Sequence, residues 1–236
     1  MLIIVAIILS YLSALRFRFM GYAGIAIHVL YVLYRGISVG RLPIVGLYDT
    51  LLFMSLSIVI FAQSFRPYIG ENRKFVAASS ISAALFLVPV AFLTPNNNPL
   101  PPVLGTYWFE IHVVLSFFAY ALFLIGSILG MLFIANGEAG LERLQYRSIL
   151  TGYTLFSVAM IAGGIWAFYA WGTYWLWTPK EIWTSVLWLY YSIYLHARLQ
   201  KSLAGKPAAV IGTIGVIVML FTYLGVGMLM KSSHSF

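Results

Sequence analysis

The chain has 236 residues, of which 62% are hydrophobic and only 8% are charged. A soluble domain of this length carries about 25% charged residues, so the composition excludes a soluble globular fold. Apolar runs near the ~20 residues that cross a bilayer recur along most of the chain, without the alternation of a membrane β-barrel. We therefore predict an all-α fold, a polytopic bundle of transmembrane helices in a lipid bilayer. The formal net charge is +8, but basic residues in a membrane protein indicate orientation rather than nucleic-acid binding.

The apolar runs predict about eight spans. In chain order these are 2–15, 19–36, 47–65, 75–93, 107–135, 149–170, 182–199 and 208–230. The first run is short for a full crossing, so seven spans is the alternative count. The connecting loops are too short to hold another domain, and we expect one transmembrane domain over residues 1–236. No basic region precedes the first apolar run, so no cleavable signal peptide is expected.

The loops between the predicted spans alternate in charge. Ten basic residues fall on one side, namely Arg16, Arg18, Arg66, Arg73, Lys74, Arg143, Arg147, Arg198, Lys201 and Lys206. Four fall on the other side, namely Arg35, Arg41, Lys180 and Lys231. The positive-inside rule makes the first side cytoplasmic. With eight spans, both termini and the loop around Lys180 are predicted to face outward.

Residues 171–183, WGTYWLWTPKEIW, form a tryptophan-rich segment between the sixth and seventh predicted helices. Thr178, Pro179 and Glu181 have the spacing of a capping box with proline at the first helical position. One interpretation of these residues is therefore structural, because a capping box starts a helix and needs no ligand. On that interpretation, Thr178 and Glu181 begin the seventh helix at the outer membrane surface.

The number of tryptophans supports a second interpretation. Tryptophan is common at membrane interfaces, but here six fall within 23 residues, namely Trp166, Trp171, Trp175, Trp177, Trp183 and Trp188. Aromatic faces of this kind stack on a flat apolar ligand. The N-terminus of the seventh helix, with Lys180 beside it, attracts carboxylates. A planar ligand with acidic substituents, such as haem with its propionates, fits both features.

The four histidines bear on this interpretation, and the absence of cysteine leaves histidine as the main candidate ligand for a metal. His112 lies about one turn inside the outer end of the fifth predicted helix, and His234 follows the outer end of the eighth. Two histidines from opposite sides complete six-coordinate haem iron. His196 lies fifteen residues after Glu181, about 22 Å deeper, towards the cytoplasmic side. His28 falls in mid-span, either as a packed residue or as part of a haem route.

Several stretches together resemble one known family. WGTYWLWTPKEIWTSVLWLYYSIYLHARL resembles the WWD motif of the CcsA (ResC) proteins of system II cytochrome c biogenesis. SVGRLPIVGLYDTLLFMS resembles an inter-helix segment of that family, and HVVLSFFAYALFLIGSILGMLF resembles its histidine-bearing helix. GVGMLMKSSHSF resembles its C-terminal histidine segment. The matches occur in order over most of the chain, which makes the resemblance more specific than a tryptophan cluster alone.

The resemblance implies that His112 and His234 bind haem iron at the outer face and that His196 lies on the haem entry route. It implies haem b as bound ligand and substrate, without a residue acting in acid–base catalysis. The remaining cofactor-binding candidates come from the WWD segment, namely Trp171, Gly172, Tyr174, Trp175, Trp177, Thr178, Lys180, Glu181 and Trp183.

The resemblance also implies a reaction and partners. Family members attach haem through thioether bonds to CXXCH motifs of apocytochrome c, a holocytochrome c synthase-type lyase activity. They act in a complex with a CcsB (ResB)-type membrane protein, and thiol-reducing assembly proteins keep the substrate cysteines reduced. The implied location is the bacterial inner membrane, with the haem site on the periplasmic face.

Two positions depart from the family pattern. The family motif commonly has aspartate where this chain has Thr178, which removes a negative charge but keeps a residue able to cap a helix. Relatives often carry histidine at the position of Arg41. Arg35, Arg41 and Asp49 fall around the same outer loop, where we expect an interfacial salt bridge and a helix cap at Asp49.

Two other functions stay open from the sequence alone. One is a haem exporter or assembly factor that binds haem without attaching it, as the related HemX-type and CcmC-type proteins indicate. The other is an electron-transfer subunit with two b haems. Such proteins pair histidines at matching depths, whereas His28 and His196 are predicted at different depths.

Overall fold

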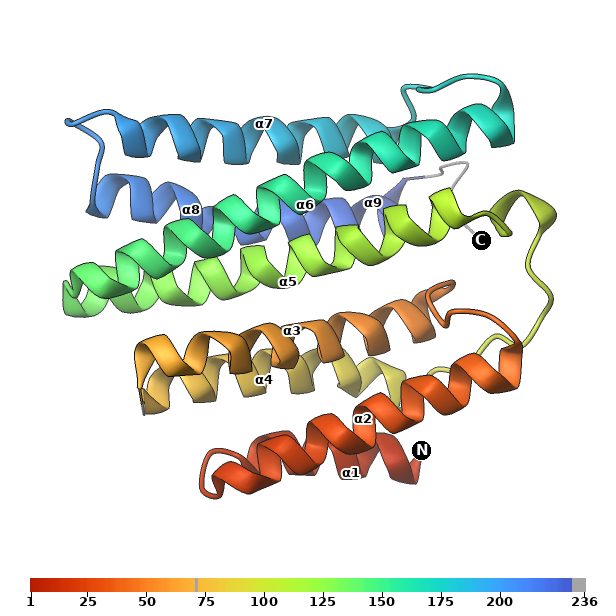
Figure 1. The fold of residues 1–236 in the computed structure, drawn as a ribbon, viewed down its shortest axis with the longest axis horizontal. Coiled ribbons are helices and arrows are strands. Elements are labelled where there is room, and N and C mark those ends of the chain that lie inside the picture. Colours follow the sequence, from red (N-terminus) through yellow and green to blue (C-terminus); the bar gives the residue numbers. More distant parts are fainter. Residues whose placement is uncertain (71, 231–236) are drawn as a thin grey trace. The chain divides into compact units, whose positions relative to one another are not determined.

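The computed structural model describes residues 1–70 and 72–230, and this part of the chain is helical with no β-strand (Figure 1). Six of the described helices are long and apolar enough to cross a membrane, which confirms the predicted transmembrane helical bundle. Helix contacts divide the chain into two compact units, Met1–Pro101 (unit 1) and Pro102–Phe236 (unit 2). A single domain over residues 1–236 stays a prediction.

The helices follow the predicted spans closely. Those of unit 1 are α1 (Leu2–Ser13), α2 (Arg18–Val39), α3 (Leu47–Ile69) and α4 (Arg73–Val90). Those of unit 2 are the 3₁₀ turn η1 (Pro102–Leu104), α5 (Tyr107–Asn136), α6 (Ala139–Trp171), α7 (Pro179–Leu199), α8 (Lys206–Leu220), the π-helical turn η2 (Phe221–Gly225) and α9 (Val226–Leu229). The last three run on as one helical segment of 24 residues.

Three helices differ in length or polarity from a full apolar span. α1 has 12 residues, a length of about 18 Å, which is short for the apolar core of a bilayer. α7 has 21 residues but is too polar to count among the six spanning helices. α6 starts at Ala139 rather than at the predicted residue 149. Its first turn carries Glu142, which pairs with Arg198 at 2.7 Å.

A buried ion pair organises one end of unit 1. Arg35 donates through Nε and Nη2 to the Asp49 carboxylate, at distances of 3.0 to 3.2 Å, and also to the Asn97 side chain at 2.6 Å. The expected salt bridge is confirmed, but the expected cap is wrong. The N-cap residue of α3 is Gly46. Asp49 lies in the first turn of α3, where its carboxylate pairs with Arg35. Arg41 donates instead to the backbone oxygen of Asn98.

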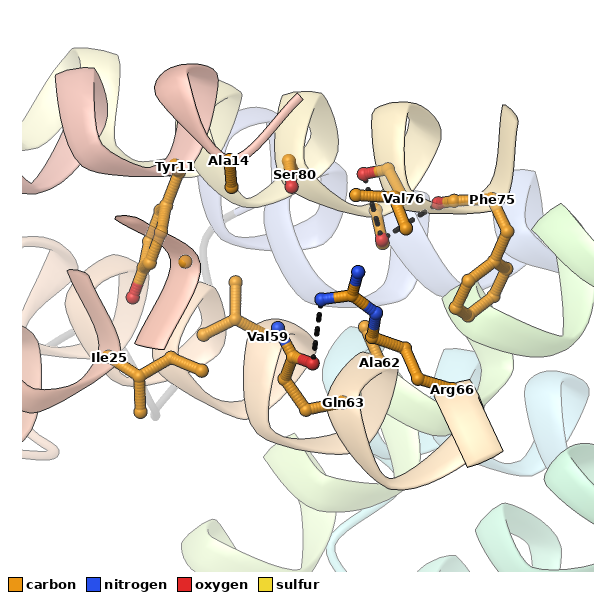
Figure 2. A pocket seen from close by; sticks show the side chains of 12 residues that line it. Tyr11, Ala14, Ile25, Val59, Ala62, Gln63, Arg66, Phe75, Val76 and Ser80 are labelled. Atoms are coloured by element: carbon orange, nitrogen blue, oxygen red, sulfur yellow. Dashed lines mark hydrogen bonds between the residues drawn. The ribbon is translucent and has the colours of Figure 1, made fainter. Parts of the chain in front are cut away.

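His28 is packed inside unit 1. Its side chain is 0% exposed, and its Nδ1 lies 2.8 Å from the Tyr11 hydroxyl. Between α1, α2, α3 and α4 is a small cavity of about 20 Å³ (Figure 2), a volume that holds about one water molecule. Arg66 and Gln63 form a hydrogen bond at its wall. The full burial of His28 and its contact with Tyr11 favour the packing interpretation, and His28 does not line this cavity.

Close helix packing in unit 2 depends on glycine residues, which have no Cβ. A Cβ on Gly152 would lie 3.0 Å from the Phe123 ring, and one on Gly212 would lie 2.6 Å from the Tyr194 ring. A Cβ on Gly215 would lie 2.7 Å from the Tyr191 ring. Small residues at such positions allow membrane helices to approach closely. This packing fixes α5, α6, α7 and α8 as the frame of the candidate site.

Candidate functional site

One end of unit 2 gathers the start of α5, the end of α6, the α6–α7 loop (residues 172–178) and the start of α7 (Figure 1). The α5–α6 and α7–α8 connections lie at the opposite end. His112 lies in the second turn of α5, so it shares this end with the tryptophan-rich segment. The structure therefore brings together one predicted haem ligand and the predicted aromatic residues.

A hydrogen bond fixes the proton on the His112 ring. Its Nδ1 lies 2.8 Å from the backbone oxygen of Ala159 on α6. A carbonyl oxygen can only accept, so Nδ1 carries the hydrogen and donates it. Nε2 is then the unprotonated nitrogen, and it has no hydrogen-bond partner among residues 1–70 and 72–230. An imidazole held in this way is prepared for a metal ligand at Nε2.

Gly163 makes this arrangement of the ring possible. A Cβ at Gly163 would lie 2.6 Å from Nδ1 of His112 and 2.9 Å from its Cε1. Any other residue on this face of α6 would push the imidazole away from the Ala159 oxygen. Gly163 and Ala159 were not among the site residues predicted from the sequence. The available signal was a pair of glycines, 163 and 164, inside an apolar helix.

Trp166 is a buried residue that packs against His112. It is only 2% exposed, and its indole N–H donates to the Val103 backbone oxygen at 2.7 Å. Its ring lies nearly parallel to His112, with centroids 6.4 Å apart, and edge-on to Trp171 at 4.9 Å. Trp166 therefore positions the His112 ring and the chain before α5, and its faces are used within the protein.

The α6–α7 loop is shaped by its ends. Gly172 ends α6 in the left-handed conformation, and the predicted capping box at Thr178 and Glu181 is confirmed. The buried Glu181 carboxylate accepts the backbone N–H groups of Leu176 at 3.0 Å and Thr178 at 2.8 Å. Glu181 thus holds the loop against the first turn of α7.

We expect Glu181→Ala to open the α6–α7 loop, because it removes the acceptor for two backbone N–H groups that would be left unpaired. Chymotrypsin cleavage after Trp175 or Trp177 in detergent-solubilised protein should accelerate at least several-fold. Loss of a helix cap typically costs about 1 kcal/mol, so α7 should persist in circular dichroism. Glu110→Ala, at a half-buried carboxylate in the first turn of α5, is the matched control and should leave the cleavage rate unchanged.

The loop presents one strained aromatic residue. Trp177 has φ of 57°, a left-handed conformation that is uncommon for a bulky residue. Its side chain is also 72% exposed, so burial of the ring does not explain this backbone conformation. Strain of this kind concentrates at ligand-binding positions. Trp177 and the half-buried Trp175, edge-on to each other at 6.5 Å, are the loop's indole surfaces for a ligand.

The other aromatic residues of the segment have partners within unit 2. Trp183 packs on Phe221 with ring centroids 4.4 Å apart. Trp188 stacks on Tyr153 and donates to Ser157. The high tryptophan count therefore serves two purposes, since part of it builds the bundle and part lies at the loop surface.

Lys180 supplies the positive charge of this end. It lies in the first turn of α7, at the same end of unit 2 as the start of α5, which carries His112. Burial lowers the pKa of its ammonium group below the ordinary value. A carboxylate placed beside Lys180 would stabilise the charged form, and the dipole of α7 acts in the same direction.

The other predicted histidines lie elsewhere. His196 is near the far end of α7, exposed, with Nδ1 donating to the Ser192 backbone oxygen at 2.7 Å. Its Nε2 is therefore also the nitrogen with the free lone pair. His234, the second predicted haem ligand at the outer face, lies outside the described residues. No group of three or more potential metal ligands occurs among residues 1–70 and 72–230.

Comparison with known proteins identifies related chains. Residues 44–234 match the family described as Cytochrome C assembly protein. A cytochrome c biogenesis protein CcsA from Chlamydomonas reinhardtii is 32% identical over 232 residues, which is 88% of this chain and 64% of the relative. CcsA of Guillardia theta is 32% identical over 239 residues, covering 86% and 79%. CcsA of Prochlorococcus marinus strain MIT 9301 is 32% identical over 248 residues, covering 88% and 80%. The chain thus spans less than two thirds of the first relative's length.

Proposed function

The chain belongs to the family of cytochrome c assembly proteins, and from this premise we propose that it binds haem b beside His112 and the α6–α7 loop. This membership confirms the family predicted from the sequence, and with it a role in cytochrome c biogenesis at a membrane. We further propose that the chain supports thioether attachment to CXXCH motifs of apocytochrome c together with a CcsB-type partner. Its proposed location is the bacterial inner membrane, with this end on the periplasmic face.

The observation that carries the proposal is the state of His112. Its Nδ1–H is used by Ala159, so the free Nε2 is the form of imidazole that binds haem iron. The exposed, strained Trp177 lies in the loop at the same end of unit 2. Lys180 adds a positive charge for a propionate. These features fit a planar ligand with an iron centre and acidic substituents.

In the proposed reaction, two cysteine thiols of the substrate add across the two vinyl groups of haem. His112, with His234 as the proposed second ligand, holds the iron, and the substrate's CXXCH histidine later replaces one of them. Trp171, Trp175 and Trp177 orient the macrocycle, while Thr178 and Glu181 act by fixing the loop. Holding thiol and vinyl in contact makes the addition effectively intramolecular. His196 is proposed to serve haem entry from the other end of α7.

The Lys180 charge gives a pH prediction. Burial lowers the Lys180 pKa in the free protein, and a propionate beside it would raise that pKa again. Binding then takes up a proton, so haem affinity should be highest below the lowered pKa and should fall as the pH rises through it. Spectroscopic haem titrations at several pH values measure this slope. Lys180→Gln should remove it, and an unchanged slope in that variant would show that another group titrates.

The function is tested by coexpressing the chain with a CcsB-type protein and an apocytochrome bearing CXXCH. Covalent haem, detected by haem staining after denaturation and by a shifted pyridine haemochrome spectrum, supports attachment. Haem that co-purifies with the membrane complex while the apocytochrome stays unmodified would instead indicate an exporter or assembly factor. A preparation without haem at any level would overturn the proposal.

A further inference from the structure

A second cavity lies at the end of unit 2 opposite His112. Its volume is about 290 Å³, near the lower limit of small-molecule sites. It is bounded by the end of α5, the start of α6, the end of α7 and the turn before α8. The lining residues are Phe133, Ala139, Glu142, Arg198, Ala204 and Gly205.

Arg198 is held rigidly in the wall of this cavity. Its Nε and Nη2 donate to the two carboxylate oxygens of Glu142 at 2.7 and 3.1 Å. The guanidinium also lies over the Tyr146 ring, 3.9 Å from its centroid. Nη1 has no hydrogen-bond partner among residues 1–70 and 72–230. A guanidinium that is held in place and has unused N–H donors can donate hydrogen bonds to an oxyanion such as a phosphate.

The surroundings of the cavity are positive. Four basic residues occur in the nearby helix ends and turn, namely Arg143, Arg198, Lys201 and Lys206, against the two acidic residues Glu138 and Glu142, an excess of two positive charges. α8 begins beside the cavity at Gly205 without a side-chain cap, so the positive end of its dipole is available. Beside Arg198, Leu199 is 75% exposed and offers apolar surface.

We propose that this cavity binds the phosphate headgroup of an anionic phospholipid. The phosphate accepts hydrogen bonds from Arg198 Nη1 and pairs with the charge of the α8 start, and the acyl chains lie along the apolar helix surface near Leu199. A lipid is favoured over a soluble phosphate because the cavity lies where the apolar helix α5 ends and the apolar helix α8 begins, and the ends of membrane-spanning helices lie near the lipid headgroups. Basic clusters at such positions attract anionic lipids.

The Glu142 carboxylate competes with the phosphate for Arg198, and this gives a test with opposite signs. Native mass spectrometry of the full chain with phosphatidylglycerol or phosphatidylcholine measures lipid affinity. Glu142→Gln should bind phosphatidylglycerol more tightly. The double variant Glu142→Gln with Arg198→Gln, which keeps a neutral pair, should bind it about fivefold more weakly than the natural chain, corresponding to about 1 kcal/mol for one basic contact.

Two control variants separate the explanations. Arg147→Gln removes the same charge from an exposed position on α6 outside the cavity and should change affinity little. Ala204→Phe fills the cavity without changing charge and should reduce binding, with thermal unfolding checked for each variant. Equal binding of both lipids, an Arg147→Gln effect as large as that of the double variant, or inorganic phosphate binding as tightly as phosphatidylglycerol would each overturn the proposal.

Discussion

Replacing His112 with alanine should abolish the low-spin haem spectrum of the proposed site and stop covalent haem attachment. The variant loses the only described nitrogen at this end that is locked with a free lone pair, whereas its neighbours remain packed. Disturbing groups that merely orient a ligand costs about 10–100-fold, so removing the ligand itself should cost more. Reduced-minus-oxidised spectra and haem staining of the coexpressed cytochrome measure both effects.

The matched control is His196→Ala, which makes the same substitution at the other end of unit 2. It should lower haem supply in cells but leave the spectrum of the bound haem unchanged. Exogenous imidazole should restore the spectrum of His112→Ala, because it can occupy the space of the missing ring. An unchanged spectrum and normal maturation in His112→Ala would contradict the ligand assignment.

Gly163→Ala should weaken haem binding about 10–100-fold although it touches no proposed ligand atom of haem. The added Cβ would lie 2.6 Å from Nδ1 of His112, so the ring must turn away from the Ala159 oxygen. Nδ1 then loses its acceptor, and the tautomer and direction of the ring are no longer fixed. Haem titration and the reduction potential of the bound haem report this change.

Gly164→Ala provides the control at the next position. Its Cβ would meet only the Tyr174 backbone oxygen at 3.5 Å, an ordinary contact, so haem binding should stay within about twofold. Alanine in place of glycine inside a helix is favourable by about 0.5–1 kcal/mol, which applies to both variants. A loss in Gly163→Ala therefore does not come from a weaker helix. Equal behaviour of the two variants would refute the positioning role of Gly163.

The sequence by itself determined which segments are helical and where α7 begins, whereas the start of α6 and the cap of α3 differed from the prediction. Each predicted apolar run became helical, because length and hydropathy decide which segments suit a bilayer. The capping box at Thr178 and Glu181 formed as predicted, since it needs only residues three apart. The Arg35–Asp49 pair also formed, because two opposite charges near an apolar interior have few other partners. Orientation and the roles of His196 and His234 remain predictions.

Only the tertiary structure decided the chemistry of the site. The His112 tautomer depends on Ala159, 47 residues away, and Trp166 is turned inward by Val103, 63 residues away. Spacing could not separate Trp166 and Trp188, which build the bundle, from the exposed Trp177. Residue type and spacing set which local structures are available, but contacts between distant segments decide which side chains are used up inside the fold and which remain free for a ligand.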